Sequence, residues 1–266
     1  MKNKRISAGV LRKALLVFFI LALVAVEIIY NLAQAPTRTD TNLYNSAVRF
    51  IGGAVCIIFM LEFSYGTVMS PLGNKKGMAL LAALPAFAVA VNNFPFVSYF
   101  SGDCKLDWGS EGILLYALFC ISVGFFEEMA FRGCVLMFLL KKRTKTKGGI
   151  FMAIFLSSVA FGLIHLVNLF TSSPIAVLLQ IGYSALIGAL CSLVLLMTKN
   201  IWICVLLHSV YNFAGGVVPE FGSGVIWTAP EITLTAVLAV LVTLYSFWLF
   251  FVKMPASNAD ELYLKD

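Results

Sequence analysis

Two glutamates and an arginine occur inside an apolar part of the chain, in the stretch GFFEEMAFRG at residues 124–133. A charged side chain at the centre of a lipid bilayer costs about 2.5 to 3.5 kcal/mol on insertion scales, so these groups need partners or a function. Glu128 and Arg132 are four residues apart, which places them on one helix face where they can form an ion pair. Glu127 is turned about 100° away from Glu128. The spacing therefore predicts one paired carboxylate and one carboxylate that is left to do chemistry.

The chain has two histidines, and both lie in apolar segments beside a second marked residue. Phe161 and His165 share one helix face in FGLIH, and His208 and Asn212 share one face in HSVYN. Ionisable residues within a membrane usually face a cavity or one another, which makes structural packing the less favoured interpretation. At a rise of about 1.5 Å per residue, these groups and Glu127 fall within about one turn either side of a common depth. The spacing allows a single site near the middle of the membrane.

A carboxylate, two imidazoles and an amide around one cavity suit the hydrolysis of a bond by water. Glu127 would take a proton from water, and one imidazole would donate a proton or hold the reacting groups in position. Asn212 with the second histidine would stabilise the oxyanion. Zinc is the alternative, because carboxylates and imidazoles are both zinc ligands, and its ligands would be Glu127, His165 and His208. The residue types do not separate these two mechanisms, so both stay open.

The rest of the sequence predicts the helices that must hold these groups. The chain is 61% hydrophobic and 12% charged, whereas soluble proteins contain about 25% charged residues. Continuous apolar runs of about 20 residues predict membrane-spanning helices rather than the short alternating strands of a barrel. We expect an all-α polytopic membrane protein that forms a single domain over residues 1–266, with a catalytic core at about 111–218. About eight spans are expected, at residues 14–34, 47–69, 77–97, 111–140, 149–170, 174–197, 201–218 and 232–252.

The distribution of basic residues predicts how the chain is oriented. Nineteen Lys and Arg residues against thirteen Asp and Glu residues give a net charge of +6. Fifteen of the nineteen fall on one predicted side, including the run KKRTKTK at 141–147, and the other side has only Arg38, Arg49 and Lys105. Loops rich in Lys and Arg stay in the cytoplasm, so both termini are expected there. Topology thus explains the basic excess, and we expect membrane lipid rather than nucleic acid as the surrounding partner.

In their order along the chain, the three motifs resemble those of the CPBP intramembrane proteases. That family includes the CAAX prenyl endopeptidases and bacterial Abi proteins that are linked to bacteriocin processing or self-immunity. Its pattern is EExxxR, then FxxxH, then HxxxN or HxxxD, on separate membrane helices. The chain has EEMAFR at 127–132, FGLIH at 161–165 and HSVYN at 208–212.

The resemblance implies a role for each matching position. Glu127 would be the catalytic glutamate that activates water, with Glu128 and Arg132 supporting it. The site would be completed by His165, His208 and Asn212. The resemblance also implies a peptide or membrane-protein substrate and a multi-pass location in the cell membrane, here the bacterial plasma membrane. Members have been described both as metalloproteases and as glutamate proteases, so zinc remains an open cofactor.

A non-proteolytic membrane protein is the main alternative. A bacteriocin self-immunity or scaffold protein, or a proton-coupled transporter, would use the same polar cluster structurally. Other intramembrane proteases fit poorly, because the motifs HExxH and GxGD are absent. The stretch GYSA at 182–185 resembles the GxSx motif of rhomboid serine proteases, but that interpretation leaves both glutamates without a role.

Overall fold

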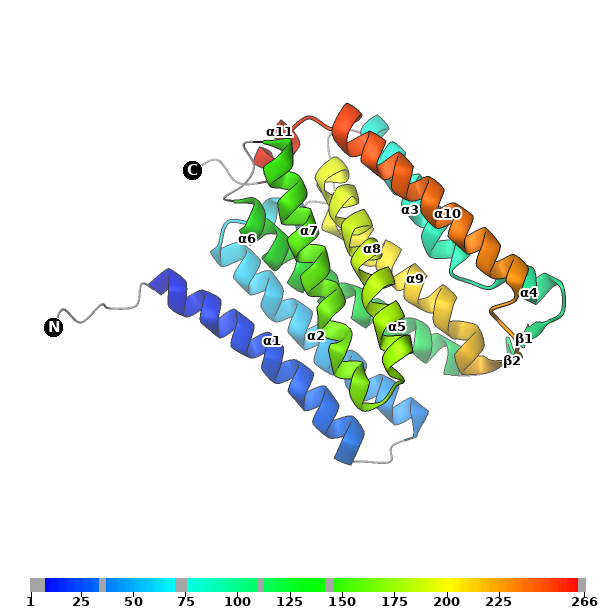
Figure 1. The fold of residues 1–266 in the computed structure, drawn as a ribbon. Helices are drawn as coiled ribbons and strands as arrows, with labels where there is room; N and C mark the ends of the chain where they lie inside the picture. The colour runs from blue at the N-terminus through cyan, green and yellow to red at the C-terminus, as the bar shows by residue number, and fades with distance from the viewer. Residues whose placement is uncertain (1–7, 34–36, 70–75, 110–111, 142–145, 263–266) are drawn as a thin grey trace.

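The computed structural model describes residues 8–33, 37–69, 76–109, 112–141 and 146–262. Almost all of this part of the chain is helical, and its two short strands lie at one end of a bundle (Figure 1). The prediction of an all-α protein is confirmed.

Eight long helical segments follow one another along the described chain. Three of them combine an α-helix with another kind of helix. α5 (Gly112–Glu128) continues through the π-helical η2 (Met129–Leu136) into α6 (Met137–Leu140). α7 (Lys147–Leu163) continues into the 3-10 helix η3 (Ile164–Phe170), and α10 (Ala229–Trp248) continues into the π-helical η4 (Leu249–Lys253). The other five are α1 (Ala8–Ala33), α2 (Arg38–Glu62), α3 (Lys76–Asn92), α8 (Pro174–Thr198) and α9 (Ile201–Phe221). The short elements are η1 (Gly66–Met69), α4 (Phe96–Phe100), β1 (Cys104–Leu106), β2 (Gly222–Gly224) and α11 (Ser257–Asp260).

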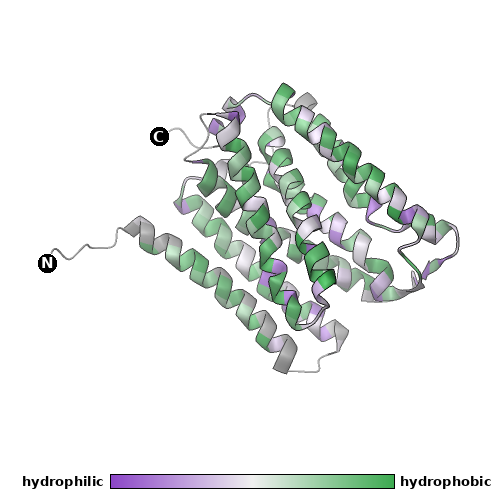
Figure 2. Cartoon of the chain, viewed as in Figure 1, coloured by the Kyte–Doolittle hydropathy of each residue, from purple (hydrophilic) through white to green (hydrophobic). Residues whose placement is uncertain are grey.

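Six helices in the described part of the chain are long and apolar enough to cross a membrane. They are Asp40–Glu62, Gly112–Leu140, Lys147–Phe170, Pro174–Thr198, Ile201–Phe221 and Ala229–Lys253. Two further apolar stretches, Ala14–Leu23 and Ala79–Asn92, are shorter. Figure 2 shows hydrophobic residues along most of the length of the helices. The chain is thus a multi-pass membrane protein, and the count of eight spans stays a prediction.

Polar side chains fix where several helices begin. The hydroxyl oxygens of Thr146 and Ser173 accept hydrogen bonds from backbone N–H groups in the first turns of α7 and α8, and Pro174 follows at the start of α8. The side chain of Asn200 does the same at the start of α9 by accepting from the N–H of Trp202. Such caps satisfy N–H groups that have no partner within the helix. They set the register of the helices that carry the histidines.

Glycines allow the central helices to approach closely. A Cβ atom at Gly124 of α5 would lie 2.5 Å from Ser209 Oγ and 2.9 Å from the carbonyl oxygen of Val205, both in α9. A Cβ atom at Gly162 of α7 would lie 2.6 Å from the carbonyl oxygen of Ile181 in α8. Small residues at such contacts bring helix backbones together in membranes. They therefore hold the helices that carry the three motifs against one another.

The connection between α3 and α5 and the connection between α9 and α10 form one cap. β1 pairs antiparallel with β2, with Lys105 opposite Ser223. The carboxylate of Glu231 at the start of α10 accepts hydrogen bonds from the N–H groups of Val97 and Ser98, at 2.7 and 3.1 Å. These bonds join segments more than 100 residues apart, so the two loops lie at the same end of the bundle (Figure 1).

Candidate active site

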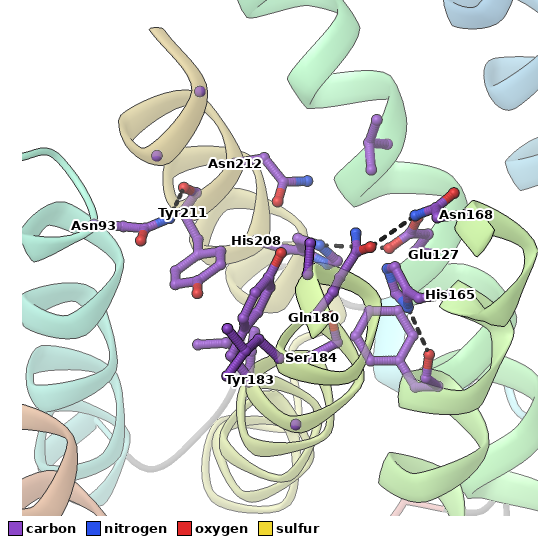
Figure 3. A pocket seen from close by; sticks show the side chains of 18 of the residues that line it. Asn93, Glu127, His165, Asn168, Gln180, Tyr183, Ser184, His208, Tyr211 and Asn212 are labelled. Carbon is purple, nitrogen blue, oxygen red and sulfur yellow. Dashed lines mark hydrogen bonds and ion pairs between the residues drawn. The ribbon is translucent and has the colours of Figure 1, made fainter. Parts of the chain in front are cut away.

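A cavity of about 1330 Å³ lies among α5, η3, α8, α9 and α10. Figure 3 shows some of the side chains that line it. All four side chains predicted to be catalytic line this cavity: Glu127, His165, His208 and Asn212. The structure therefore brings together residues that are up to 85 positions apart in the sequence, since 212 − 127 = 85.

The two adjacent glutamates lie in different surroundings. Glu128 is completely buried, and Arg132 Nη1 lies 3.1 Å from its Oε1 atom, so the predicted ion pair is present. Glu127 keeps 21% of its side-chain surface exposed and faces the cavity. The helix turns one carboxylate into the bundle, where charge is paired, and the other toward the cavity.

His208 connects both glutamates. Its Nδ1 atom lies 2.8 Å from Glu128 Oε1, and because a carboxylate only accepts, Nδ1 carries the hydrogen and donates it. Its Nε2 atom lies 3.5 Å from Glu127 Oε2. A bond from one ring nitrogen to a carboxylate fixes the tautomer and the ring orientation. Glu128 therefore aims His208 Nε2 at Glu127.

The contact between His208 and Glu127 depends on which of their atoms carries a hydrogen. With its hydrogen on Nδ1, a neutral His208 presents only an acceptor at Nε2, and an ionised Glu127 is also an acceptor. His208 Nε2 and Glu127 Oε2 can form a hydrogen bond only when one of them carries a proton. The fixed ring thus places His208 Nε2 where it can accept a hydrogen bond from a protonated Glu127.

Phe161 is the packing centre of the site. Its ring meets the ring of His165 edge-on at 5.4 Å between centroids and the ring of His208 edge-on at 5.7 Å. The guanidinium carbon of Arg132 lies 4.4 Å from the centroid of the same ring. Aromatic pairs in this geometry and cations over a ring face are both favourable. One phenyl ring therefore orients both histidines and the buried cation.

Arg132 is held by charge rather than by aligned hydrogen bonds. It is 1% exposed, and within the described residues its guanidinium nitrogens have no hydrogen-bond partner. Its neighbours are the Glu128 carboxylate and the Phe161 ring. A Cβ atom at Gly188 of α8 would lie 3.0 Å from Arg132 Nη2, so the missing side chain at Gly188 makes room for the guanidinium.

The other two predicted residues are placed differently. His165 Nδ1 lies 3.1 Å from the carbonyl oxygen of Phe161, one turn back along the helix, so Nδ1 donates and Nε2 is left as the acceptor when the ring is neutral. Asn212 lies one turn after His208 on α9 and is half-buried at the cavity wall. Figure 3 shows its amide in the open space beside His208.

A π-helical segment follows the glutamates directly. α5 ends at Glu128, and η2 runs from Met129 to Leu136 and includes Arg132. π-helical turns are rare and occur frequently at functional sites. The regular spacing of 3.6 residues per turn does not predict this change.

The fit of the site to a metal ion can be judged from its donor atoms. Among the described residues, no group of three His, Cys, Asp or Glu side chains is arranged to hold a metal ion. The proposed zinc ligands Glu127, His165 and His208 all line the cavity, but only His208 and Glu127 are in contact. The arrangement does not fit a three-ligand zinc site.

Several polar residues of the cavity were not predicted from the sequence. Asn168 Nδ2 donates to Gln180 Oε1 at 2.8 Å, and both side chains line the cavity (Figure 3). Arg49, which the charge count placed outside the membrane, lies within α2 at the cavity wall, 4.7 Å from the Phe119 ring centroid. Neutral amides carry little signal in a sequence. Arg49 was missed because it lies near the predicted start of its span.

The fold and the site define an integral membrane protein with a carboxylate and two histidines in one cavity between its helices. Residues 109–214 match the family model described as type II CAAX prenyl endopeptidase Rce1-like. The matched range contains all three motifs, and over this range the chain is similar to the CAAX protease (CPBP) family, a family of membrane peptidases. No curated protein and no solved structure matches the chain significantly.

Proposed function

We propose that the protein is an intramembrane endopeptidase in which Glu127 activates the water that attacks a peptide bond. The observation that carries the proposal is the contact of Glu127 Oε2 with His208 Nε2, 3.5 Å apart in a cavity between membrane helices. The family match to prenyl endopeptidases supports peptide hydrolysis as the reaction class.

In the proposed reaction, Glu127 takes a proton from water as the water oxygen bonds to the carbonyl carbon of the substrate. His208 Nε2 stabilises the proton on this carboxylate, and Glu128 holds the ring in place. The carbon–nitrogen bond then breaks, and the proton passes from Glu127 to the leaving amine. General acid–base catalysis of this kind contributes typically about 10²- to 10⁴-fold to a rate.

The amide of Asn212 is the proposed donor to the oxyanion. It lies at the cavity wall beside His208 and is half-buried, so its N–H groups can reach a substrate oxygen. His165 is the proposed second partner, which polarises the carbonyl group when it is protonated. Donors of this kind act strongly because they are oriented before the charge develops.

The proposed substrate is a peptide or a membrane protein, and the proposed setting is the bacterial plasma membrane. A comparison of membrane peptidomes from cells with the wild-type chain and cells with Glu127→Gln tests this. We expect peptides that appear only with the wild-type chain and that share a cleavage position. Identical peptidomes would contradict the proposal and favour the non-proteolytic alternative.

Metal dependence is tested separately on the purified protein. The glutamate mechanism predicts that a strong chelator leaves turnover unchanged. Loss of turnover on chelation, with recovery on adding zinc, would keep the same residues but move the activation of water to a bound metal.

A further inference from the structure

The 3-10 helix that follows the FGLIH motif arranges its side chains in rows. A 3-10 helix has about three residues per turn, so residues three apart lie directly above one another. In η3 (Ile164–Phe170) and its capping residue, one such row consists of His165, Asn168 and Thr171. All three line the cavity. A polar row therefore leads away from the catalytic end of the cavity.

The other two rows of η3 differ in kind. One row is apolar and also lines the cavity, and it consists of Ile164, Val167 and Phe170. The third row holds Leu166 and Leu169, which are 46% and 47% exposed and are not part of the cavity wall. The helix thus presents a polar row and an apolar row side by side to whatever occupies the cavity.

Gln180 of α8 extends the polar row across the cavity. Asn168 Nδ2 donates to Gln180 Oε1 at 2.8 Å. Within the part of the chain that the structure describes, neither Asn168 Oδ1 nor the amide nitrogen of Gln180 bonds to another protein atom. The pair therefore offers the cavity one free acceptor and an amide donor, at fixed positions (Figure 3).

The spacing of the row matches an extended peptide. At a rise of about 2.0 Å per residue, groups three apart in a 3-10 helix are about 6 Å apart. The backbone groups along one edge of an extended chain recur every second residue, at about 6.6 Å. Backbone polar groups of an unwound segment must be satisfied within a membrane, which is what a row of donors and acceptors provides.

We infer that the row of His165, Asn168 and Thr171, together with Gln180, binds the backbone of the substrate in an extended conformation. The inference rests on the proposed function. It makes Asn168 and Gln180 positioning residues that place the scissile bond at Glu127. Backbone recognition of this kind depends little on side-chain sequence, so the enzyme accepts extended apolar segments and does not cleave the same segment while it is helical.

The experiment uses purified full-length protein and fluorescence-quenched short apolar peptides as probes. A matched set carries N-methyl groups at alternate residues, which remove backbone N–H donors. We expect Asn168→Leu and Gln180→Met to raise KM about two- to tenfold, the loss expected for one hydrogen bond, with kcat changed less than about twofold. Leu169→Ala, next to Asn168 but outside the cavity, is the control and should leave both constants unchanged.

The N-methylated probes distinguish binding from folding. We expect one N-methyl position to cost the wild-type enzyme about as much as Asn168→Leu does, and to cost that variant little more, because both changes remove the same bond. An unchanged KM in both Asn168→Leu and Gln180→Met would overturn the inference. The inference would also be overturned if N-methylation of the probe raised KM equally in the wild type and in the variants. Absence of Glu127-dependent hydrolysis in the wild type would instead contradict the proposed function.

Discussion

Glu127 and Glu128 show how two identical neighbours acquire different roles from their surroundings. Glu128 lies between Arg132 and His208, at 3.1 and 2.8 Å, and has no exposed surface. Glu127 contacts the far nitrogen of His208 and faces the cavity. The first carboxylate supports structure by balancing charge, and the second is accessible to a substrate.

This division predicts that substitutions of Arg132 and of Glu127 differ in their effect on stability. Arg132→Met should lower the free energy of unfolding by about 3 to 5 kcal/mol, because it leaves Glu128 as an uncompensated buried charge. Glu127→Gln keeps size and shape at a half-buried position and should unfold like the wild type. Thermal unfolding in detergent measures both. Equal destabilisation by the two changes would count against the assignment.

The proposed unit of Glu127 and His208 makes a second prediction about activity. If the two groups share one proton, Glu127→Gln and His208→Gln should each remove nearly all turnover, and the double variant should lose hardly more than either single one. If the two groups contributed independently, the fold-losses in turnover of the two single variants would multiply in the double variant. Turnover of the two single variants and the double variant, assayed on one peptide, decides between them.

At the residue scale, the contacts of charged residues were more predictable from the sequence than those of neutral residues. The four-residue spacing of Glu128 and Arg132 was enough to predict their ion pair, which is present. The central position of Phe161 was not predicted, because a phenylalanine in an apolar helix carries no signal of its own. Asn168 had a signal that was not used: polar residues recur every third position in IHLVNLFT, the period of a 3-10 helix.

The positions of the membrane helices were predictable, because the length of each apolar run in the sequence determines them. The expected span 174–197 is α8 at Pro174–Thr198, and the expected span 111–140 is the helix Gly112–Leu140. The π-helical segments were not predictable, because they depend on packing between helices. A Cβ atom at Gly133 of η2, for example, would collide with the sulfur of Met60 in α2, a contact that no local pattern reveals.

Close packing of α8 on the buried arginine gives a prediction for that element. Gly188→Ala puts a methyl group 3.0 Å from Arg132 Nη2 and 3.2 Å from Phe161, and should cost about 1 to 3 kcal/mol of stability and most of the activity. Gly182→Ala is the matched control, since a Cβ atom there meets nothing within 4 Å. Thermal unfolding and peptide turnover measure both variants. Equal behaviour of the two would contradict this packing role.

The whole molecule has two dissimilar ends. At one end, β1 and β2 pair and Glu231 accepts from the start of α4. At the other, Lys199 pairs with Glu261, and Lys147 donates to the carbonyl oxygen of Phe251. Because basic residues favour the cytoplasm, the second end is predicted to be cytoplasmic and the cap external.

Labelling tests this orientation. Single cysteines introduced at Lys105 and Ser223, in the cap, should react with an impermeant thiol reagent on intact cells. Tags at both termini should be protected from external protease. Protection of the cap, or external exposure of either terminus, would contradict the predicted topology and the even number of spans.

The site depends on the whole bundle, because Glu127, His165 and His208 come from three helices that meet only in the folded protein. The most direct test of the account is the turnover of purified wild-type protein and Glu127→Gln on a peptide in liposomes, with folding checked by thermal unfolding. We predict that the variant folds like the wild type, still binds the peptide and hydrolyses it at least about 10²-fold more slowly. Undiminished hydrolysis by a folded Glu127→Gln variant would contradict the catalytic role of this carboxylate and leave the cluster as a structural one.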